Sequence, residues 1–97
     1  MKTCHIFVSG FVQGVGFRQF VKRSAIKLDL TGWVRNVTDN RVEALLQGDK
    51  ETIEKMIGIC KKGPFLSEVK NVEVFWEDHP PAGGGEFDSF TISRPDQ

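Results

Sequence analysis

The chain has few of the residues on which metal sites and disulfide frameworks depend. Among its 97 residues there are only two cysteines and two histidines. Cys4 and Cys60 lie far apart with no Cys-x-x-Cys spacing, and His5 and His79 do not cluster. A structural zinc site needs about four ligands at tighter spacing, so the sequence predicts no such site. We expect two reduced, buried thiols, and we expect neither a metal nor any other cofactor.

The chain also lacks an excess of charge and a long hydrophobic run. Its 13 basic and 13 acidic residues cancel, so the overall charge attracts neither nucleic acid nor an anionic membrane. No apolar stretch approaches the length of a membrane span, and Met1 to His5 contain no apolar core of a signal peptide. We therefore expect a cytoplasmic protein without a nucleic-acid or membrane partner, folded as one domain over residues 1–97.

The first half of the chain combines strand and helix patterns. Residues 3–9 alternate between apolar and polar and predict a half-buried strand. From residue 18 to about residue 28, apolar side chains at helical spacing predict a helix with a basic outer face. Residues 31–37 and 42–46 predict a hairpin, whose turn at 38–41 contains Asp and Asn, which tolerate a left-handed backbone.

The second half continues with one helix and two strands. We expect Asp49 to cap a helix that ends at Gly63-Pro64 and whose apolar face is formed by Ile53, Met56, Ile57 and Cys60. Residues 72–77 predict a fourth strand, and residues 87–93 predict a short last strand. Residues 79–86 contain three glycines but no helix follows them, so they predict a flexible connection.

This order predicts an α+β fold, the ferredoxin-like split βαβ sandwich. It would consist of βαββαβ plus a short last strand, with a mostly antiparallel sheet and two helices on one face. The helices would cover the strand face that carries Ile6, Val8, Val34, Ala44, Leu46, Val72 and Val74. Because this fold hosts many functions, the function has to be argued from a site.

The most informative stretch runs from Val12 to Arg18, between the first strand and the first helix. Gly14 and Gly16 would let the loop turn and bring its backbone N–H groups close to an anion, although glycines in such a turn can also serve packing alone. The helix N-terminus adds unpaired N–H groups, and Arg18 offers a planar guanidinium to phosphate or carboxylate oxygens. A cation in the first turn opposes the helix dipole, and a bound anion would relieve that conflict. The stretch therefore predicts a local oxyanion site.

Several motifs together resemble the acylphosphatase family over nearly the whole chain. They are Val12-Gln13-Gly14-Val15-Gly16-Phe17-Arg18, Gly32-Trp33-Val34-Arg35-Asn36, Val42-Glu43-Ala44, Gly63-Pro64 and Phe90-Thr91-Ile92. That family hydrolyses the mixed anhydride of acyl phosphates to a carboxylate and inorganic phosphate, without a metal. The resemblance implies that this chain is an acylphosphatase whose substrate is a small acyl phosphate. Acetyl, carbamoyl and glyceroyl phosphates share the same phosphoryl end, so the motifs do not distinguish them.

The resemblance also implies roles for individual residues. Arg18 corresponds to the phosphate-binding arginine, and Asn36 corresponds to the asparagine that positions the attacking water. The phosphate cradle is the backbone of Gln13, Gly14, Val15, Gly16 and Phe17. An acyl phosphate is already activated, so the chemistry needs positioning and charge stabilisation more than a strong nucleophile. A side-chain amide does not titrate near neutral pH, so Asn36 would hold the water while the substrate phosphate accepts its proton.

Two positions depart from the family pattern. Phe11 stands where the family often has a basic residue, and losing that cation would weaken the attraction of an anionic substrate. Asn40 stands where the family commonly has glycine in the hairpin turn. Because Asn is the next best residue for a positive φ, we expect the turn to form at small cost.

Other classes of protein share this order of elements. An RNA-recognition module would need stacking aromatics on its third strand, where residues 42–46 contain none. A regulatory module that binds an anion without hydrolysing it would carry the same cradle and remains an alternative. So do the acylphosphatase-like domains of carbamoyl-transfer maturation proteins. A chain of 97 residues favours a free-standing, monomeric enzyme over such a domain.

Overall fold

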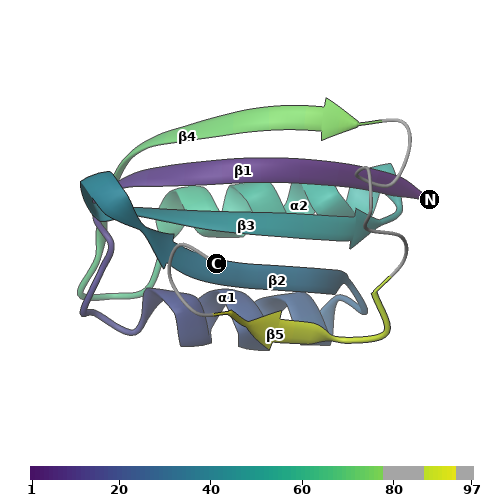
Figure 1. Cartoon of the computed structure of the whole chain (residues 1–97), viewed down its shortest axis with the longest axis horizontal. Helices are drawn as coiled ribbons and strands as arrows, with labels where there is room; N and C mark the ends of the chain where they lie inside the picture. The colour runs from purple at the N-terminus through teal and green to yellow at the C-terminus, as the bar shows by residue number, and fades with distance from the viewer. Residues whose placement is uncertain (78–86, 94–97) are drawn as a thin grey trace.

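A computed structural model of the chain describes residues 1–77 and 87–93. Within these residues the elements follow the predicted order, as Figure 1 shows. They are β1 (Lys2–Phe11), α1 (Phe17–Lys27), β2 (Thr31–Val37), the 3₁₀ turn η1 (Thr38–Asn40), β3 (Arg41–Gly48), α2 (Lys50–Lys62), β4 (Glu68–Glu77) and β5 (Phe90–Ile92). The flexible connection predicted at 79–86 lies outside the described residues.

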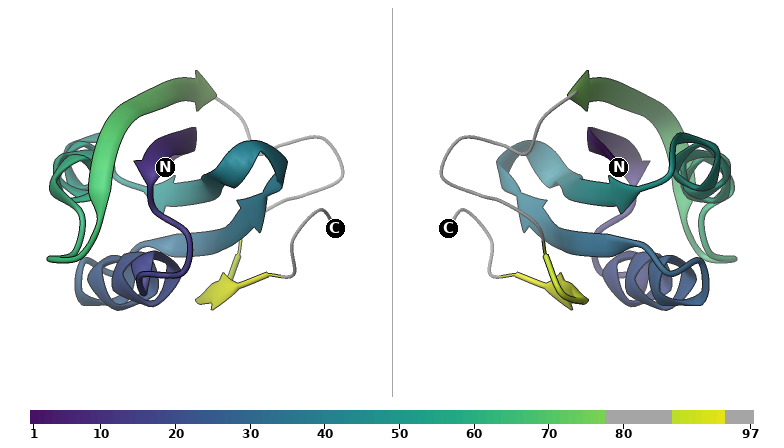
Figure 2. Two further views of the ribbon diagram at one scale, coloured as in Figure 1. Left: turned by 90° about the vertical axis from the view of Figure 1, so that its left-hand side faces the viewer. Right: turned by 90° about the vertical axis from the view of Figure 1, so that its right-hand side faces the viewer.

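The strands form one sheet with the order β4-β1-β3-β2-β5. The first four strands pair antiparallel, and β5 pairs parallel to β2. Both described α-helices lie on the same face of this sheet (Figure 2). The predicted ferredoxin-like arrangement, mostly antiparallel with two helices on one face, is confirmed.

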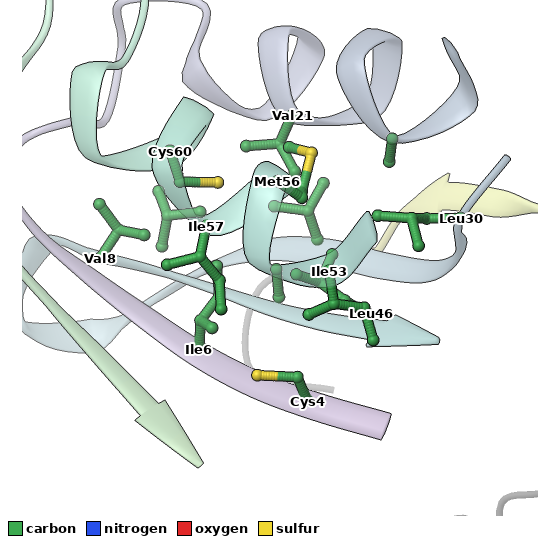
Figure 3. Packing of buried hydrophobic residues seen from close by; sticks show 14 of the residues in the cluster. Cys4, Ile6, Val8, Val21, Leu30, Leu46, Ile53, Met56, Ile57 and Cys60 are labelled. Atoms are coloured by element: carbon green, nitrogen blue, oxygen red, sulfur yellow. The ribbon is translucent and has the colours of Figure 1, made fainter. Parts of the chain in front are cut away.

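The core lies between the helices and the sheet, where apolar side chains from both layers interdigitate (Figure 3). Alternation along β1 turns Cys4, Ile6 and Val8 toward the helices, as predicted, and each is at most 1% exposed. The helices contribute Phe17, Val21, Ala25, Ile53, Met56, Ile57 and Cys60. On β4, which is an edge strand, Val72 and Val74 are only half-buried against this core.

Both cysteines are buried and free, as expected. Burial raises the pKa of the Cys60 thiol to about 12. Burial, with a smaller contribution from the nearby Glu77 carboxylate, raises the pKa of Cys4 to about 11. Both groups are therefore neutral, unreactive thiols near neutral pH.

Some element boundaries differ from those predicted. β4 begins at Glu68, not at residue 72, because its first residues, which are polar except for Val69, gain strand geometry by pairing with the end of β1, where Phe11 lies opposite Glu68. The last strand is shorter than predicted and spans only Phe90–Ile92. Asp49 occupies the N-cap position of α2, as predicted, although its side chain makes no capping hydrogen bond.

The connections that matter for the site meet at one end of the sheet. The β1–α1 connection, the β2–β3 turn and the α2–β4 connection all lie at the left-hand end in Figure 1. Because β2 runs back along α1, the last residues of β2 return to the beginning of that helix. In the turn, Asp39 and Asn40 have φ angles of 71° and 60°, which confirms the predicted left-handed backbone.

Candidate functional site

A small pocket opens at the beginning of α1. Its volume is about 190 Å³, and it is lined by Val12, Gly14, Gly16, Phe17, Arg18, Gln19 and Ile92. Pockets for drug-sized ligands usually enclose roughly 300–1,000 Å³, so this one suits an ion or a small group. Four of the seven predicted site residues line it, namely Gly14, Gly16, Phe17 and Arg18.

The backbone of the pocket depends on two left-handed glycines. Gly14 and Gly16 have φ angles of 77° and 78°. A Cβ atom built at either position would meet nothing within 4 Å, so the backbone angle and not crowding favours glycine. Left-handed residues within a tight turn can point successive N–H groups into one concavity, which is a common anion-binding geometry.

The N-terminus of α1 adds further donors. The Phe20 N–H is bonded to the Gly16 carbonyl at 3.0 Å. The N–H groups of Phe17, Arg18 and Gln19 lie before that bond and have no acceptor within the helix. The first turn contains no acidic residue, and no side chain caps it. The positive end of this helix is therefore left open to an anion.

Arg18 lies in this first turn, half-buried at the pocket wall. Among residues 1–77 and 87–93 it forms no ion pair with a carboxylate. A guanidinium at the positive end of a helix is unfavourable by itself. An anion in the pocket would therefore be bound by the arginine and would offset the repulsion at the same time.

Asn36 lies near the end of β2, on the face of the sheet that the helices cover. It pairs with Val42, which in turn pairs with Val8, and both valines are buried core residues. Two residues earlier on the same face, Val34 pairs with Ile92, which lines the pocket. Asn36 itself does not line the pocket, but it belongs to the adjacent strand end.

The amide oxygen of Asn36 is an unusual buried group. Within the described part of the chain, Asn36 Oδ1 is inaccessible to solvent and has no hydrogen-bond partner. A buried acceptor without a partner costs about 1–3 kcal/mol. Such a group near a pocket suits a role in holding a water molecule or a ligand.

The remaining predicted residues, Gln13 and Val15, do not line the pocket. Val15 packs against the core. The side-chain amide of Gln13 donates to the carbonyls of Val37 and Arg41, at 3.0 and 2.9 Å. The predicted set lacked Gln19 and Ile92, although Ile92 belongs to the terminal motif of the resemblance and Gln19 follows Arg18 in the first helical turn.

The two departures from the family pattern lie at the same end of the molecule. Phe11 is 61% exposed at the end of β1. With Gln13 and Asn40 it lines a separate hollow beside the β2–β3 turn. Neither Phe11 nor Asn40 lines the pocket at α1.

Residues 1–77 and 87–93 lack two further kinds of functional feature. No group of three or more His, Cys, Asp or Glu side chains there is arranged to hold a metal ion. Neither described α-helix combines the length and apolarity needed to cross a membrane.

Comparisons with known proteins agree with this geometry. A model of the acylphosphatase family matches residues 4–92. An acylphosphatase from Pelotomaculum thermopropionicum is 46% identical over 89 residues, which covers 92% of each chain. The crystal structure of an acylphosphatase from Bacillus subtilis superimposes with a TM-score of 0.86 and 36% identity, covering 96% of this chain and 99% of that one.

A larger protein contains a similar segment. The structure of T. kodakarensis HypF matches with a TM-score of 0.82 and 38% identity, covering 99% of this chain but only 12% of that chain. The family model and the Pelotomaculum relative both extend over nearly the whole length of the present chain. The chain therefore belongs to the acylphosphatase family.

Proposed function

We propose that this acylphosphatase-family enzyme hydrolyses the carboxyl-phosphate anhydride of small acyl phosphates, with the phosphoryl group bound at the beginning of α1. One observation carries the proposal. Two left-handed glycines, an uncapped helix N-terminus and Arg18 surround a single pocket of about 190 Å³. Backbone donors and a guanidinium around such a pocket match the oxygens of one phosphoryl group.

The cradle, residues 13–17, and Arg18 would hold the phosphoryl oxygens. Their donors belong to a folded loop and a helix, so they would be oriented before the substrate arrives. Such preorganised donors stabilise charge as it redistributes in the transition state. They would also supply the positive charge for which other phosphoryl-transfer enzymes use Mg²⁺, so the proposed reaction needs no metal.

Asn36 would hold the attacking water. The water oxygen would attack phosphorus, the bond between phosphorus and the acyl oxygen would break, and its electron pair would leave with the carboxylate. The water proton would pass to a phosphate oxygen, because an amide side chain cannot act as a general base near neutral pH. This role is supported by Oδ1 of Asn36, which is buried and has no hydrogen-bond partner among residues 1–77 and 87–93.

We further propose that the enzyme acts as a monomer and has no nucleic-acid partner. The net charge of zero supports the second point. Sedimentation equilibrium would test the first, and a second copy required for activity would contradict it.

The direct test is phosphate release from acetyl phosphate in the presence of EDTA, with ¹⁸O-labelled water. We expect turnover in EDTA and label in phosphate, not in acetate. Label in acetate would mean attack at the carbonyl carbon and would contradict the proposed role of Asn36. Activity abolished by EDTA and restored by a divalent ion would contradict metal independence. Phosphate binding without turnover would identify the non-catalytic, anion-binding alternative.

A further inference from the structure

The side chain of Gln13 joins the phosphate cradle to the β2–β3 hairpin. Its Nε2 atom donates to the carbonyl oxygen of Val37 at 3.0 Å and to that of Arg41 at 2.9 Å. A primary amide has two N–H donors, so both are used in these bonds. The family resemblance concerns only the backbone of Gln13 and leaves this side chain without a role.

The two acceptors lie at the neck of the hairpin. Val37 is the last residue of β2, and it pairs with Arg41, the first residue of β3. The 3₁₀ turn η1 connects the two. Val37 directly follows Asn36 in the chain. The amide of Gln13 therefore holds both strands at the point where β2 presents Asn36.

The sheet joins β1 to β2 only indirectly, through β3. The cradle follows β1, whereas Asn36 lies on β2, and β3 separates these two strands in the sheet order β4-β1-β3-β2-β5. No ladder of backbone hydrogen bonds joins β1 to β2 directly. In the described part of the chain, the side chain of Gln13, the first residue of the cradle, spans this gap by its hydrogen bonds to the hairpin.

We propose that Gln13 is a positioning residue that fixes the distance between the phosphate donors of the cradle and the amide of Asn36. In-line attack requires the water oxygen to be held at a defined distance and direction from the phosphorus atom. A displacement of about 1 Å can lower the rate by about 10²-fold. Functional groups of this kind have to be held within about 0.5 Å. This inference rests on the proposed function, because it assigns Gln13 to the geometry of the same reaction.

The first test uses Gln13→Met, which keeps the approximate size of the side chain and removes both donors. We expect kcat for acetyl phosphate to fall by about 10²-fold, while the inhibition constant for inorganic phosphate stays within about threefold because the cradle and Arg18 remain. Unchanged kcat, or an equal loss of kcat and phosphate affinity, would overturn the proposal. Wild-type turnover is measured first, so a failure of the proposed function is recognised separately.

A matched control separates positioning from general stability. Gln47 is buried at the other end of β3, where its amide donates to Thr3 Oγ1 at 3.4 Å and accepts from the Phe87 N–H at 3.0 Å. We expect Gln47→Leu to lower the denaturation midpoint without lowering kcat at temperatures where the protein is folded. Equal losses of kcat in the Gln13 and Gln47 variants would assign Gln13 to folding alone.

A double-mutant cycle tests whether Gln13 acts through Asn36. If it positions Asn36, Gln13→Met should cost about 10²-fold in the wild-type background and less than about threefold in an Asn36→Ala background. Additive losses would overturn the proposal, since they would show that Gln13 acts independently of Asn36.

Should Gln13→Met fail to fold, Gln13→Glu provides a second measurement. A carboxylate facing two carbonyl oxygens cannot donate, whereas a protonated carboxyl can donate one hydrogen bond. The two carbonyls disfavour the charged form and raise the pKa of the introduced carboxyl. We expect activity of this variant to recover as the pH falls through that pKa, relative to wild type. A pH profile parallel to that of wild type would contradict the positioning role.

Discussion

The two helices begin with opposite charges. Both close their first turn with the same backbone bond, from Phe20 N–H to Gly16 O at 3.0 Å in α1 and from Ile53 N–H to Asp49 O at 2.9 Å in α2. Neither N-cap residue makes a side-chain capping hydrogen bond.

What differs is the charge placed beside the helix dipole. In α2 the N-cap residue is Asp49 and Glu51 lies in the first turn, and these two carboxylates outnumber the one cation there, Lys50, so the net negative charge stabilises the helix. α1 begins with a left-handed glycine, has no acidic residue in its first turn and carries Arg18 there. α2 supplies its own negative charge, whereas α1 leaves that place for an anion from outside. Under the proposed function, the lower stability of this N-terminus would be offset when an anion binds.

The largest expected effects come from removing the two groups proposed to act on the substrate. Arg18→Ala should weaken both phosphate binding and turnover, because the guanidinium group would bind the phosphoryl oxygens in the ground state and in the transition state. Asn36→Ala should lower turnover while leaving phosphate affinity nearly intact, because Asn36 would hold the water and not the anion. We expect losses in kcat on the order of 10²-fold or more.

Steady-state kinetics and phosphate inhibition of the folded variants check these expectations. Arg23→Ala, at an exposed position farther along α1, serves as the matched control and should change neither quantity. A folded Arg18→Ala variant with wild-type binding and turnover would refute the assignment of the site.

The next largest effect is expected from replacing glycines at two positions where an added Cβ atom would have room. Gly16 has a φ of 78°, whereas Gly58 lies inside α2, and a Cβ atom would meet nothing within 4 Å at either position. Gly16→Ala should destabilise the protein by about 1–2 kcal/mol, because alanine is strained in the left-handed region. It should also weaken phosphate binding. Gly58→Ala should stabilise the protein by about 0.5–1 kcal/mol without changing turnover. Urea denaturation should show that the free energy of unfolding falls in the Gly16 variant and rises in the Gly58 variant. Changes of the same sign would contradict this interpretation of the loop.

A smaller effect is expected from introducing a carboxylate into the first turn of α1, where α2 already has one. Gln19→Glu would introduce a carboxylate into the first turn of α1, at the pocket wall. We expect it to stabilise the helix by about 0.3–1 kcal/mol and to weaken phosphate binding by about fivefold through repulsion. The reciprocal change, Glu51→Gln in α2, should reduce stability by a similar amount without affecting turnover. Tighter phosphate binding by the Gln19 variant would contradict an anion site at α1.

Local sequence patterns were enough to predict those features of the fold and of the candidate site that lie within one short segment of the chain. The glycines, Arg18 and the helix start are contiguous, so their geometry follows from a strand-to-helix turn. The same holds for β2, whose predicted bounds of residues 31–37 agree with the structure.

The unpredicted features depend on distant partners. Residues 68–71, which lack a regular alternation of apolar and polar side chains, form a strand because β1 lies beside them. The acceptors of the Gln13 amide are backbone carbonyls 24 and 28 residues away. Side-chain chemistry does not encode such acceptors, since every residue has a carbonyl and only the folded hairpin brings these two together.

The smallest effect on activity is expected from the thiols beneath α2. Cys60 lies on its buried face and Cys4 on β1 (Figure 3). Replacing both by alanine should leave kcat unchanged.

The two thiols should also make stability depend on pH. Their ordinary pKa is 9.0 and burial raises it to about 11 for Cys4 and about 12 for Cys60, so ionisation favours the unfolded state. The stability that depends on the neutral thiols is therefore complete below pH 9, and it is lost as the pH rises through the folded-state pKa values of about 11 for Cys4 and about 12 for Cys60. Urea midpoints at pH 7 and 10 should differ more for wild type than for the double variant, and an equal difference would contradict the raised pKa values.

The central claim is that the beginning of α1, and not that of α2, binds the phosphoryl group. Titration of the ¹⁵N-labelled protein with inorganic phosphate, followed by amide NMR shifts, tests it most directly. We expect the largest shifts at the backbone amides of residues 14–18, with a smaller response of the Asn36 side-chain amide, while the amides of residues 50–52 stay unchanged. Larger shifts at residues 50–52, or none at residues 14–18 at phosphate concentrations that inhibit turnover, would contradict it.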